Sequence, residues 1–246
     1  MTLVEHLAEL RRRLIISVLA VLAGGVIAFA LYNGILSFLT APLCRSLPQA
    51  GAQVHKAIGY HGQSCALYVT SPLAGFSIRI TIAAYGGIFL ASPILLWQLW
   101  RFITPGLNPR EKRYAVPFIT ASILLFSTGA AIAYLVSEKA LHFLNTVGGP
   151  TLTQIYSPNS YLKFITLLMV AFGVAFEFPV VLISLELAGV LSTARLKKWR
   201  RRAIVIIFAL SAVLIPSSDP FSLFALAIPL CLFYEGAILV GRFLGR

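Results

Sequence analysis

The 246 residues are 59% hydrophobic and only 11% charged, with a mean hydropathy of +0.88. A soluble domain has no core large enough for so many apolar side chains, so this composition excludes a soluble fold and indicates a polytopic, all-α membrane protein. The formal net charge of +12 would suggest a nucleic-acid partner for a soluble protein, but here its distribution along the chain explains it without nucleic acid.

The N-terminal residues predict a short helix on the membrane surface, followed by the first span. Four leucines recur at helical spacing and give this helix one apolar face, with Glu9 on the side toward water: Leu3, Leu7, Leu10 and Leu14. The apolar run at about residues 14–39 is too long for the core of a signal peptide and lacks a small-residue cleavage site. We therefore expect it to be retained as a span.

Five further apolar runs predict a single membrane domain, residues 1–246, with six transmembrane helices. The later spans are expected at about residues 72–100, 116–136, 164–185, 203–215 and 221–240. Loops 40–71, 137–163 and 216–220 then lie on one side of the membrane, and loops 101–115 and 186–202 on the other. The fifth run ends at Pro216 and rises only about 20 Å, against a hydrocarbon core of about 30 Å. This short helix is expected to thin the bilayer beside it.

Basic residues concentrate on one side of this arrangement, which sets the predicted orientation. That side holds Arg11, Arg12, Arg13, Arg101, Arg110, Lys112, Arg113, Arg195, Lys197, Lys198, Arg200, Arg201, Arg202, Arg242 and Arg246. The opposite side holds only Arg45, Lys56, Lys139 and Lys163, with Arg79 in or near the second span. By the positive-inside rule, both termini are expected in the cytoplasm, where the basic segments face anionic lipid.

Glu177 is a carboxylate deep inside the fourth predicted span. A charged side chain there costs about 2.5 kcal/mol or more unless it is paired, protonated or facing a polar cavity, so we expect it to be functional and to need a partner. Pro179 follows two residues later and should bend the helix beside the acid, because it lacks an amide donor and crowds the carbonyl of Ala175. The alternative is a glutamate that only stabilises helix packing.

Cysteines and histidines in the first external loop raise two further possibilities. Cys44 and Cys65 both fall there, which favours a disulfide over free thiols in the oxidising environment outside a bacterial cytoplasm. His55 and His61 share the loop, but their spacing matches no zinc site. We expect neither a metal nor a cofactor.

Catalytic motifs are not found in the sequence. Asp219 is the only aspartate, which excludes a two-aspartate intramembrane protease, and HExxH, GxSxG and GxxxxGK[ST] are absent. The chain is therefore not expected to be an enzyme. Nor do the two halves contain corresponding helices broken by Gly or Pro, as many secondary transporters do.

Four stretches, taken in order on a six-span frame, resemble the TatC family, the core subunit of the twin-arginine (Sec-independent) protein translocase. They are HLAELRRRL from His6, FITPGL from Phe102 followed by Glu111, FEFP from Phe176, and PSSD from Pro216 followed by Ser222. The resemblance covers nearly the whole chain. One departure is Leu223, where the family often has glutamine after the position of Ser222.

The resemblance implies a receptor, in a bacterial inner membrane, for the signal peptides of folded preproteins with twin-arginine signals. It also implies export driven by the proton-motive force, TatA- and TatB-type single-span partners, and self-association in a larger complex. In the family, the positions of Glu9 and Glu111 contact the arginine pair, and the position of Glu177 is a polar feature of the concave membrane face. Glu177 with Pro179 is then the expected contact with an intramembrane partner. Asp219 is then a possible site in the external turn.

Alternatives remain for each of these acids. Glu9 could pair with Arg13 four residues on, and Glu111 could cap its helix. For the whole protein, the competing class is a proton- or ion-coupled transporter of small solutes that uses Glu177.

Overall fold

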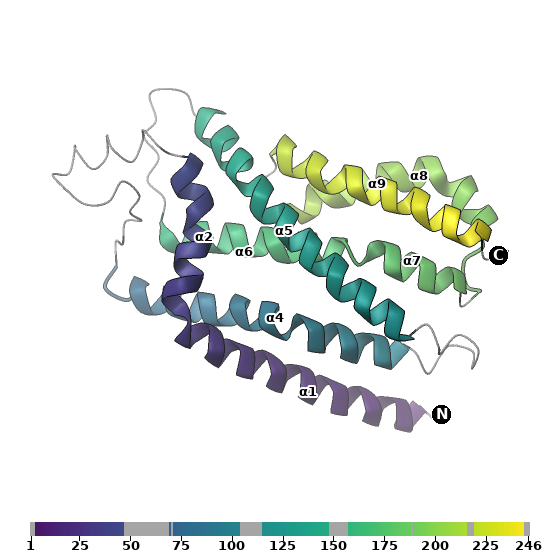
Figure 1. The fold of residues 1–246 in the computed structure, drawn as a ribbon, viewed down its shortest axis with the longest axis horizontal. Coiled ribbons are helices and arrows are strands. Elements are labelled where there is room, and N and C mark those ends of the chain that lie inside the picture. Colours follow the sequence, from purple (N-terminus) through teal and green to yellow (C-terminus); the bar gives the residue numbers. More distant parts are fainter. Residues whose placement is uncertain are drawn as a thin grey trace.

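The computed structural model describes residues 3–46, 69, 71–103, 115–147, 157–187, 189–215 and 219–243. All regular elements in this part of the chain are α-helices, as the composition predicts (Figure 1). They are α1 (Leu3–Ala30), α2 (Tyr32–Ser46), α4 (Ala74–Ile103), α5 (Ala115–Val147), α6 (Pro158–Ala175), α7 (Phe178–Leu187), α8 (Thr193–Leu214) and α9 (Pro220–Phe243). Both chain ends lie at the same end of the molecule (Figure 1).

Five helical stretches in the described residues are long and apolar enough to cross a membrane. They are Leu7–Ala30, Ala74–Phe102, Val116–Val147, Pro158–Leu187 and Pro220–Phe243. The fifth span that we predicted, within α8, is not among them because the helix begins with a run of Lys and Arg. Its apolar part, residues 203–214, would rise only about 18 Å. The count of six spans therefore stays a prediction.

The N-terminal region differs from the prediction in two ways. No separate surface helix precedes the first span, because α1 runs without a break from Leu3 to Ala30. The span also ends earlier than residue 39: the chain turns at Leu31 and continues as α2, which packs against α5 and α4 (Figure 1). Residues 40–46, expected in a loop, are helical.

Two tyrosines hold α2 in place. Pro42 has no amide hydrogen, so it cannot donate to the carbonyl of Phe38 one turn earlier. The hydroxyl of Tyr134 on α5 donates to that carbonyl instead, at 2.9 Å, and its ring stacks on Phe38 with centroids 4.3 Å apart. The hydroxyl of Tyr161 on α6 donates to the carbonyl of Leu39 at 2.5 Å. The orientation of α2 thus depends on side chains that are distant in sequence.

Helices α1 and α4 pack along each other through glycines. A Cβ atom on Gly87 would lie 2.7 Å from the carbonyl oxygen of Val21, and one on Gly24 would lie 2.8 Å from the carbonyl oxygen of Gly87. Only glycine allows two backbones to approach so closely. Since α1 has few contacts with any other helix, α4 is its main attachment to the bundle.

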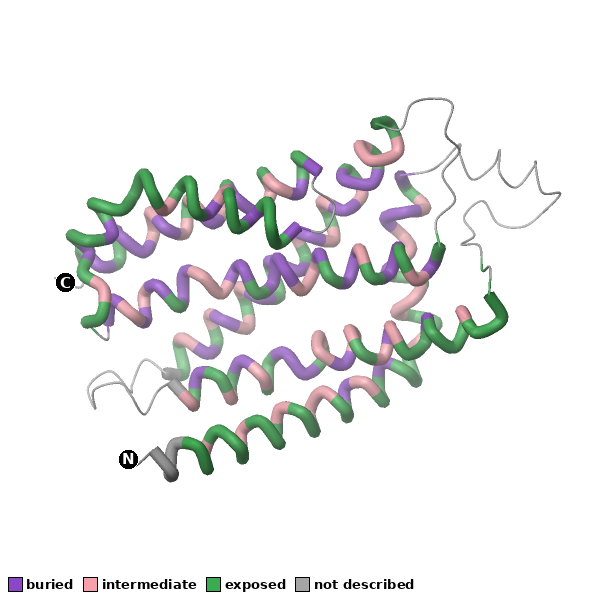
Figure 2. The backbone as a smooth tube through the Cα atoms, turned by 180° about the vertical axis from the view of Figure 1, so that it is seen from behind, coloured by how far each residue is buried: buried purple, intermediate pink, exposed green. Residues whose placement is uncertain are grey.

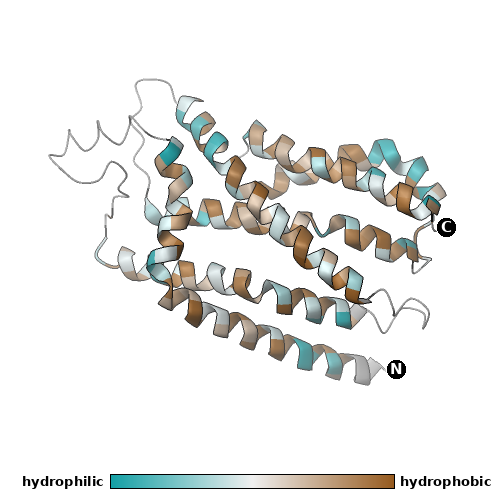
Figure 3. Ribbon diagram, viewed as in Figure 1, coloured by the Kyte–Doolittle hydropathy of each residue, from teal (hydrophilic) through white to brown (hydrophobic). Residues whose placement is uncertain are grey.

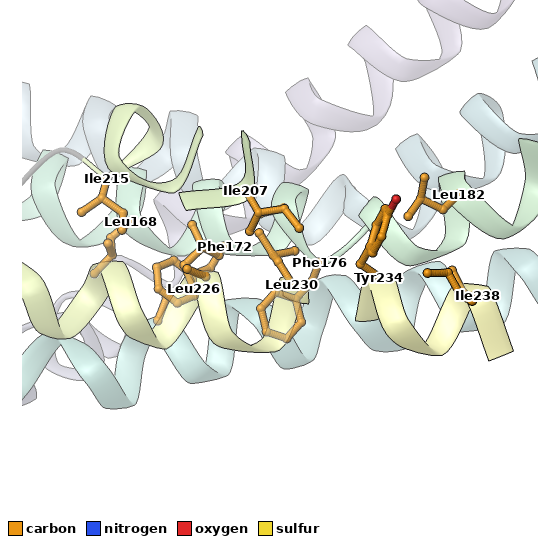
Figure 4. Packing of buried hydrophobic residues seen from close by; sticks show 14 of the residues in the cluster. Leu168, Phe172, Phe176, Leu182, Ile207, Ile215, Leu226, Leu230, Tyr234 and Ile238 are labelled. Carbon is orange, nitrogen blue, oxygen red and sulfur yellow. The ribbon is translucent and has the colours of Figure 1, made fainter. Parts of the chain in front are cut away.

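Helices α6 and α7 form the most buried of the candidate spans, with 67% of its most apolar window buried, against 11% for α1 (Figure 2). The largest cluster of buried hydrophobic residues packs around them, and includes Phe172, Phe176, Leu226, Leu230 and Tyr234 (Figure 4). α5 approaches α6 closely because Gly129 faces the carbonyl of Phe172, and Gly173 faces the ring of Phe126. These helices form the centre of the fold.

The basic segment 195–202 is helical, although we predicted a loop at residues 186–202. Gly189 makes the turn after α7 with φ 71°, a conformation that favours glycine. Ser192 then caps α8: its side chain accepts from the amide of Arg195 at 3.3 Å. Lys and Arg are good helix formers, so the capped segment continues as helix. Figure 3 shows this hydrophilic start of α8 near the C-terminus.

The other predicted loop on that side, 101–115, is shorter at both ends, because α4 continues to Ile103 and α5 begins at Ala115. α5 also extends to Val147 and α6 begins at Pro158, so the external loop predicted at 137–163 is shorter than expected.

Candidate functional site

Glu9 lies on α1 in an ion pair with Arg13, one turn further along the helix. Arg13 also donates to the backbone carbonyl of Gln98 on α4, at 3.4 Å. The carboxylate of Glu9 is therefore held beside the α1–α4 interface, with a quarter of its side chain exposed. Glu111 lies outside the described residues, so the convergence of the two acids stays a prediction. The simple i,i+4 pairing of Glu9 is present in the structure.

Glu177 lies at a break between two helices, as the proline pattern predicts. α6 ends at Ala175 and α7 begins at Phe178. The amide of Glu177 donates to the carbonyl of Val174 at 3.1 Å, a tighter turn than that of an α-helix. Pro179 is buried in the first turn of α7, where its missing amide hydrogen does no harm. The two residues therefore act together, as expected.

A chain of polar side chains links Glu177 to α4 and α5. The indole Nε1 of Trp100 donates to the hydroxyl of Ser122 at 2.6 Å, and Ser122 lies beside the side chain of Glu177. A hydroxyl has one hydrogen to donate and two lone pairs, so Ser122 can accept from Trp100 and still has a hydrogen to offer an acceptor such as Glu177. The second oxygen of Glu177, Oε1, is buried and has no hydrogen-bond partner among the described residues.

The environment of Glu177 is an apolar cavity of about 520 Å³. Its walls come from α4, α6, α7, α8 and α9, with α5 contributing Phe126. Of the described residues in the lining, Glu177 is the one that is ionisable. An acid in such surroundings can bind a polar group that would otherwise be stranded in an apolar medium. The concave membrane face predicted around this residue stays a prediction.

The polar chain was not predicted from the sequence. A tryptophan near the end of a span usually anchors it at the membrane interface. Trp97 is 43% exposed and fits that role, whereas Trp100 is 4% exposed and packs inside. Ser122 lies within a long apolar run and is one of many serines. No local pattern distinguishes these two residues, because their partners lie on other helices.

Asp219 is buried and caps α9. Its Oδ1 accepts from the backbone amide of Ser222 at 2.7 Å, the usual arrangement at a helix N-terminus. This is a structural role for the residue expected in an external-turn site; residues 216–218 of that turn lie outside the described part of the chain. Among the described residues, Ser222 Oγ is buried without a hydrogen-bond partner.

Glu186 is a second buried acid, which the sequence analysis missed. It is 1% exposed and accepts a hydrogen bond from Thr193 at 3.1 Å, across the turn between α7 and α8. Gly241 of α9 packs directly against both side chains, with no room for a Cβ atom. The sequence did contain an indication that Glu186 is buried, because leucine flanks it on both sides at the end of an apolar run.

Cys44 takes part in a disulfide, whereas Cys65 lies outside the described residues, as do His55 and His61. The pairing of Cys44 with Cys65 therefore stays a prediction. Cys231 is a free thiol on α9. Within the described ranges, no group of three or more His, Cys, Asp or Glu side chains is arranged to hold a metal ion.

A bundle of apolar helices around a carboxylate-lined cavity defines the chain as a multi-pass helical membrane protein. Residues 5–229 match the model of one family, described as Sec-independent protein translocase protein (TatC). The chain belongs to this family, which confirms the resemblance seen in the sequence. It also confirms the prediction of a transport component and not an enzyme.

Individual relatives and solved structures agree with this assignment. The chain is 40% identical to the Sec-independent protein translocase protein TatC of Aquifex aeolicus, over all of the chain and 97% of that protein. It is also 40% identical to TatC of Frankia casuarinae, over 98% of the chain, but it spans only 65% of that relative. A crystal structure of the twin-arginine translocase receptor TatC superposes with a TM-score of 0.76 at 39% identity, covering 98% of this chain and all of the other.

Proposed function

We propose that this protein is the receptor for twin-arginine signal peptides and the core of a translocase that exports folded proteins, driven by the proton-motive force. The observation that carries the proposal is the match over almost the full length to a solved twin-arginine translocase receptor. The match to this family gives no support to the solute-transporter alternative.

We propose that Glu9 and Glu111 together bind the two arginines of the signal, and that Glu9 accepts one of the two guanidiniums. The carboxylate is already held by Arg13 and, through it, by Gln98 on the neighbouring helix. A carboxylate has lone pairs for more than one donor, so a second arginine can bind beside Arg13. Arginine fits a carboxylate with two parallel hydrogen bonds, whereas lysine offers only a point charge. The receptor should therefore distinguish an arginine pair from a lysine pair.

Exposed ion pairs contribute only about 0–1 kcal/mol each, whereas micromolar binding needs about 8 kcal/mol. The two acids therefore set specificity, and the apolar segment of the signal must supply most of the affinity.

The test is binding of twin-arginine and twin-lysine signal peptides, otherwise identical, to the purified protein. We expect the twin-lysine peptide to bind more weakly, and the Glu9→Ala/Glu111→Ala double variant to lose this difference. Glu235→Ala is the control, because this acid pairs with Arg200 at the other side of the bundle. Equal binding of both peptides to the unchanged protein would rule out the receptor assignment.

We propose that Glu177 binds a polar side chain of a TatA- or TatB-type single-span subunit. The acid lines an apolar cavity, and its Oε1 has no partner among the described residues. Interhelical hydrogen bonds in membranes contribute about 0.6 kcal/mol on average and about 1.7 at most, so the contact sets the docking position and stays reversible.

Two substitutions separate docking from proton coupling. Glu177→Gln keeps the hydrogen-bonding capacity and removes the titratable charge, whereas Glu177→Ala removes both. We expect the Gln variant to retain much of the transport activity, and the Ala variant to lose crosslinks between the subunit and α6–α7. An inactive Gln variant with normal crosslinks would contradict the docking role and favour proton coupling.

The proposed location is a bacterial inner membrane, with both termini in the cytoplasm and several copies in a larger complex. Two features support the orientation: the chain ends lie at the same end of the molecule, and the basic start of α8 lies near the C-terminus (Figures 1 and 3). The positive-inside rule then places this end in the cytoplasm.

A further inference from the structure

A second apolar groove, separate from the polar atoms around Glu177, lies along α8 where it faces α7 and α9. Its volume is about 510 Å³. The walls are formed mainly by Phe178, Leu182, Leu196, Ile206, Leu210 and Tyr234. In the described part of the chain, the lining also includes the charged residue Arg195 and the tryptophan Trp199. Nothing in the proposed receptor function uses this groove.

The face of α8 that borders the groove changes character along the helix. It begins with Arg195, continues with Trp199 one turn later, and then becomes apolar through Ala203, Ile206 and Leu210. Trp199 is 48% exposed, and the guanidinium of Arg202 lies 5.7 Å from the centre of its ring. Along this face of α8, a cationic side chain is therefore followed by an amphipathic aromatic side chain, and then by apolar side chains.

The same order describes a phospholipid in one leaflet: a phosphate, then the polar–apolar boundary, then an acyl chain. Tryptophan prefers that boundary, and arginine binds phosphate with parallel hydrogen bonds. Arg200, in contrast, pairs with Glu235 on α9 and does not line the groove. Arg195 lines the groove and has no ion pair among the described residues, so it is the cation placed for a headgroup.

We propose that this groove binds an acidic phospholipid, with one acyl chain along α8 and the phosphate at Arg195. The groove is too small to enclose a peptide helix: a helix is at least about 10 Å wide with its side chains, so 510 Å³ would hold only about one turn. An acyl chain is thinner and fits. An acidic headgroup is favoured over a zwitterionic one because the nearby charges on α8 are all positive from Arg195 to Arg202.

The experiment measures lipid binding to the purified full-length protein by native mass spectrometry, from micelles that contain a known fraction of one lipid. The probes are palmitoyl-oleoyl phosphatidylglycerol and the phosphatidylcholine with the same chains. We expect tighter binding of phosphatidylglycerol, and about fivefold weaker binding after Arg195→Gln. The matched control is Arg201→Gln, the same change at an exposed position of α8 that does not line the groove.

A second pair of variants tests the acyl chain. Ala203→Leu narrows the groove, whereas Ala209→Leu places the same side chain on an exposed face of α8. We expect only the first to weaken lipid binding, with the thermal unfolding midpoint showing that both variants fold. Soluble glycerol phosphate, which has no acyl chain, should not compete.

Three results would each overturn the proposal. One is a lack of charge selectivity, seen either as equal binding of the two lipids or as an equal loss of phosphatidylglycerol binding in Arg195→Gln and Arg201→Gln. It would mean that the lipid binds unspecifically to the positive surface. Another is competition by glycerol phosphate, which would indicate a free-phosphate site. The third is unchanged lipid binding in Ala203→Leu with impaired binding of a signal peptide, which would assign the groove to a peptide. Lipid binding is measured without a signal peptide, so failure of the receptor assignment would leave this test intact.

Discussion

The close packing of α1 on α4 predicts a large effect for a very small substitution, Gly87→Ala. The new Cβ would lie 2.7 Å from the carbonyl oxygen of Val21 and 2.8 Å from the amide nitrogen of Gly25, and both atoms belong to the backbone of α1. No side-chain rotation can relieve these contacts. To reach an ordinary separation of 3.4 Å, the two helices must move apart by roughly 0.7 Å along most of their contact.

Overpacking of this kind costs about 1–3 kcal/mol, whereas replacing glycine by alanine within a helix recovers about 0.5–1 kcal/mol. The difference is a net destabilisation of up to about 2.5 kcal/mol, concentrated in α1 because this helix has few other contacts. Signal-peptide binding should also weaken, since the contact of Arg13 with Gln98 that positions Glu9 spans the same interface.

The assay is thermal unfolding in detergent, together with crosslinking of cysteines placed on α1 and α4. Gly236→Ala is the control, because a Cβ there meets no atom within 4 Å, and that variant should be as stable as the parent or slightly more stable. If Gly87→Ala unfolds at the same temperature as Gly236→Ala and crosslinks normally, the reasoning from backbone contact is wrong.

Two other predictions concern the polar chain and the short helix. Trp100→Phe removes the donor to Ser122 and should lower the free energy of unfolding by about 1–2 kcal/mol. Trp97→Phe, at an exposed position, should change it by less than about 0.5 kcal/mol. Comparable thermal midpoints for the two variants would contradict a structural role for the Trp100–Ser122 hydrogen bond. Insertion of four leucines after Leu210 lengthens the apolar part of α8 by about 6 Å. If local thinning of the bilayer contributes to transport, this variant should export less folded cargo. Unchanged export would show that thinning does not contribute.

Much of the fold could be predicted from the sequence because the responsible signals are local. Apolar runs locate the helices, and Glu177 with Pro179 marks the break between α6 and α7, since an acid and a proline act on the backbone around them. The turn at Leu31 and the course of α2 could not be predicted in this way. They depend on hydroxyl groups of Tyr134 and Tyr161, which lie about a hundred positions further along the chain.

The same distinction applies to the candidate site. The acids Glu9 and Glu177 stand out in the sequence because carboxylates are rare in it, and both were identified. Ser122 and Trp100 belong to residue types that are ordinary in membrane helices, so only the packing of α4, α5 and α7 shows their connection to Glu177. Glu186 was missed for another reason: it was treated as the beginning of a loop, whereas α7 continues through it to Leu187.

The attachment of α2 also constrains the order in which the protein assembles during synthesis. α2 leaves the ribosome immediately after α1, but the groups that hold its Phe38 and Leu39 carbonyls belong to α5 and α6. Until those helices are made, α2 can pack only on α1 and α4, and the two carbonyls lack the hydroxyl donors that later hold them. The last contacts of an early helix therefore form only after later helices have been synthesised.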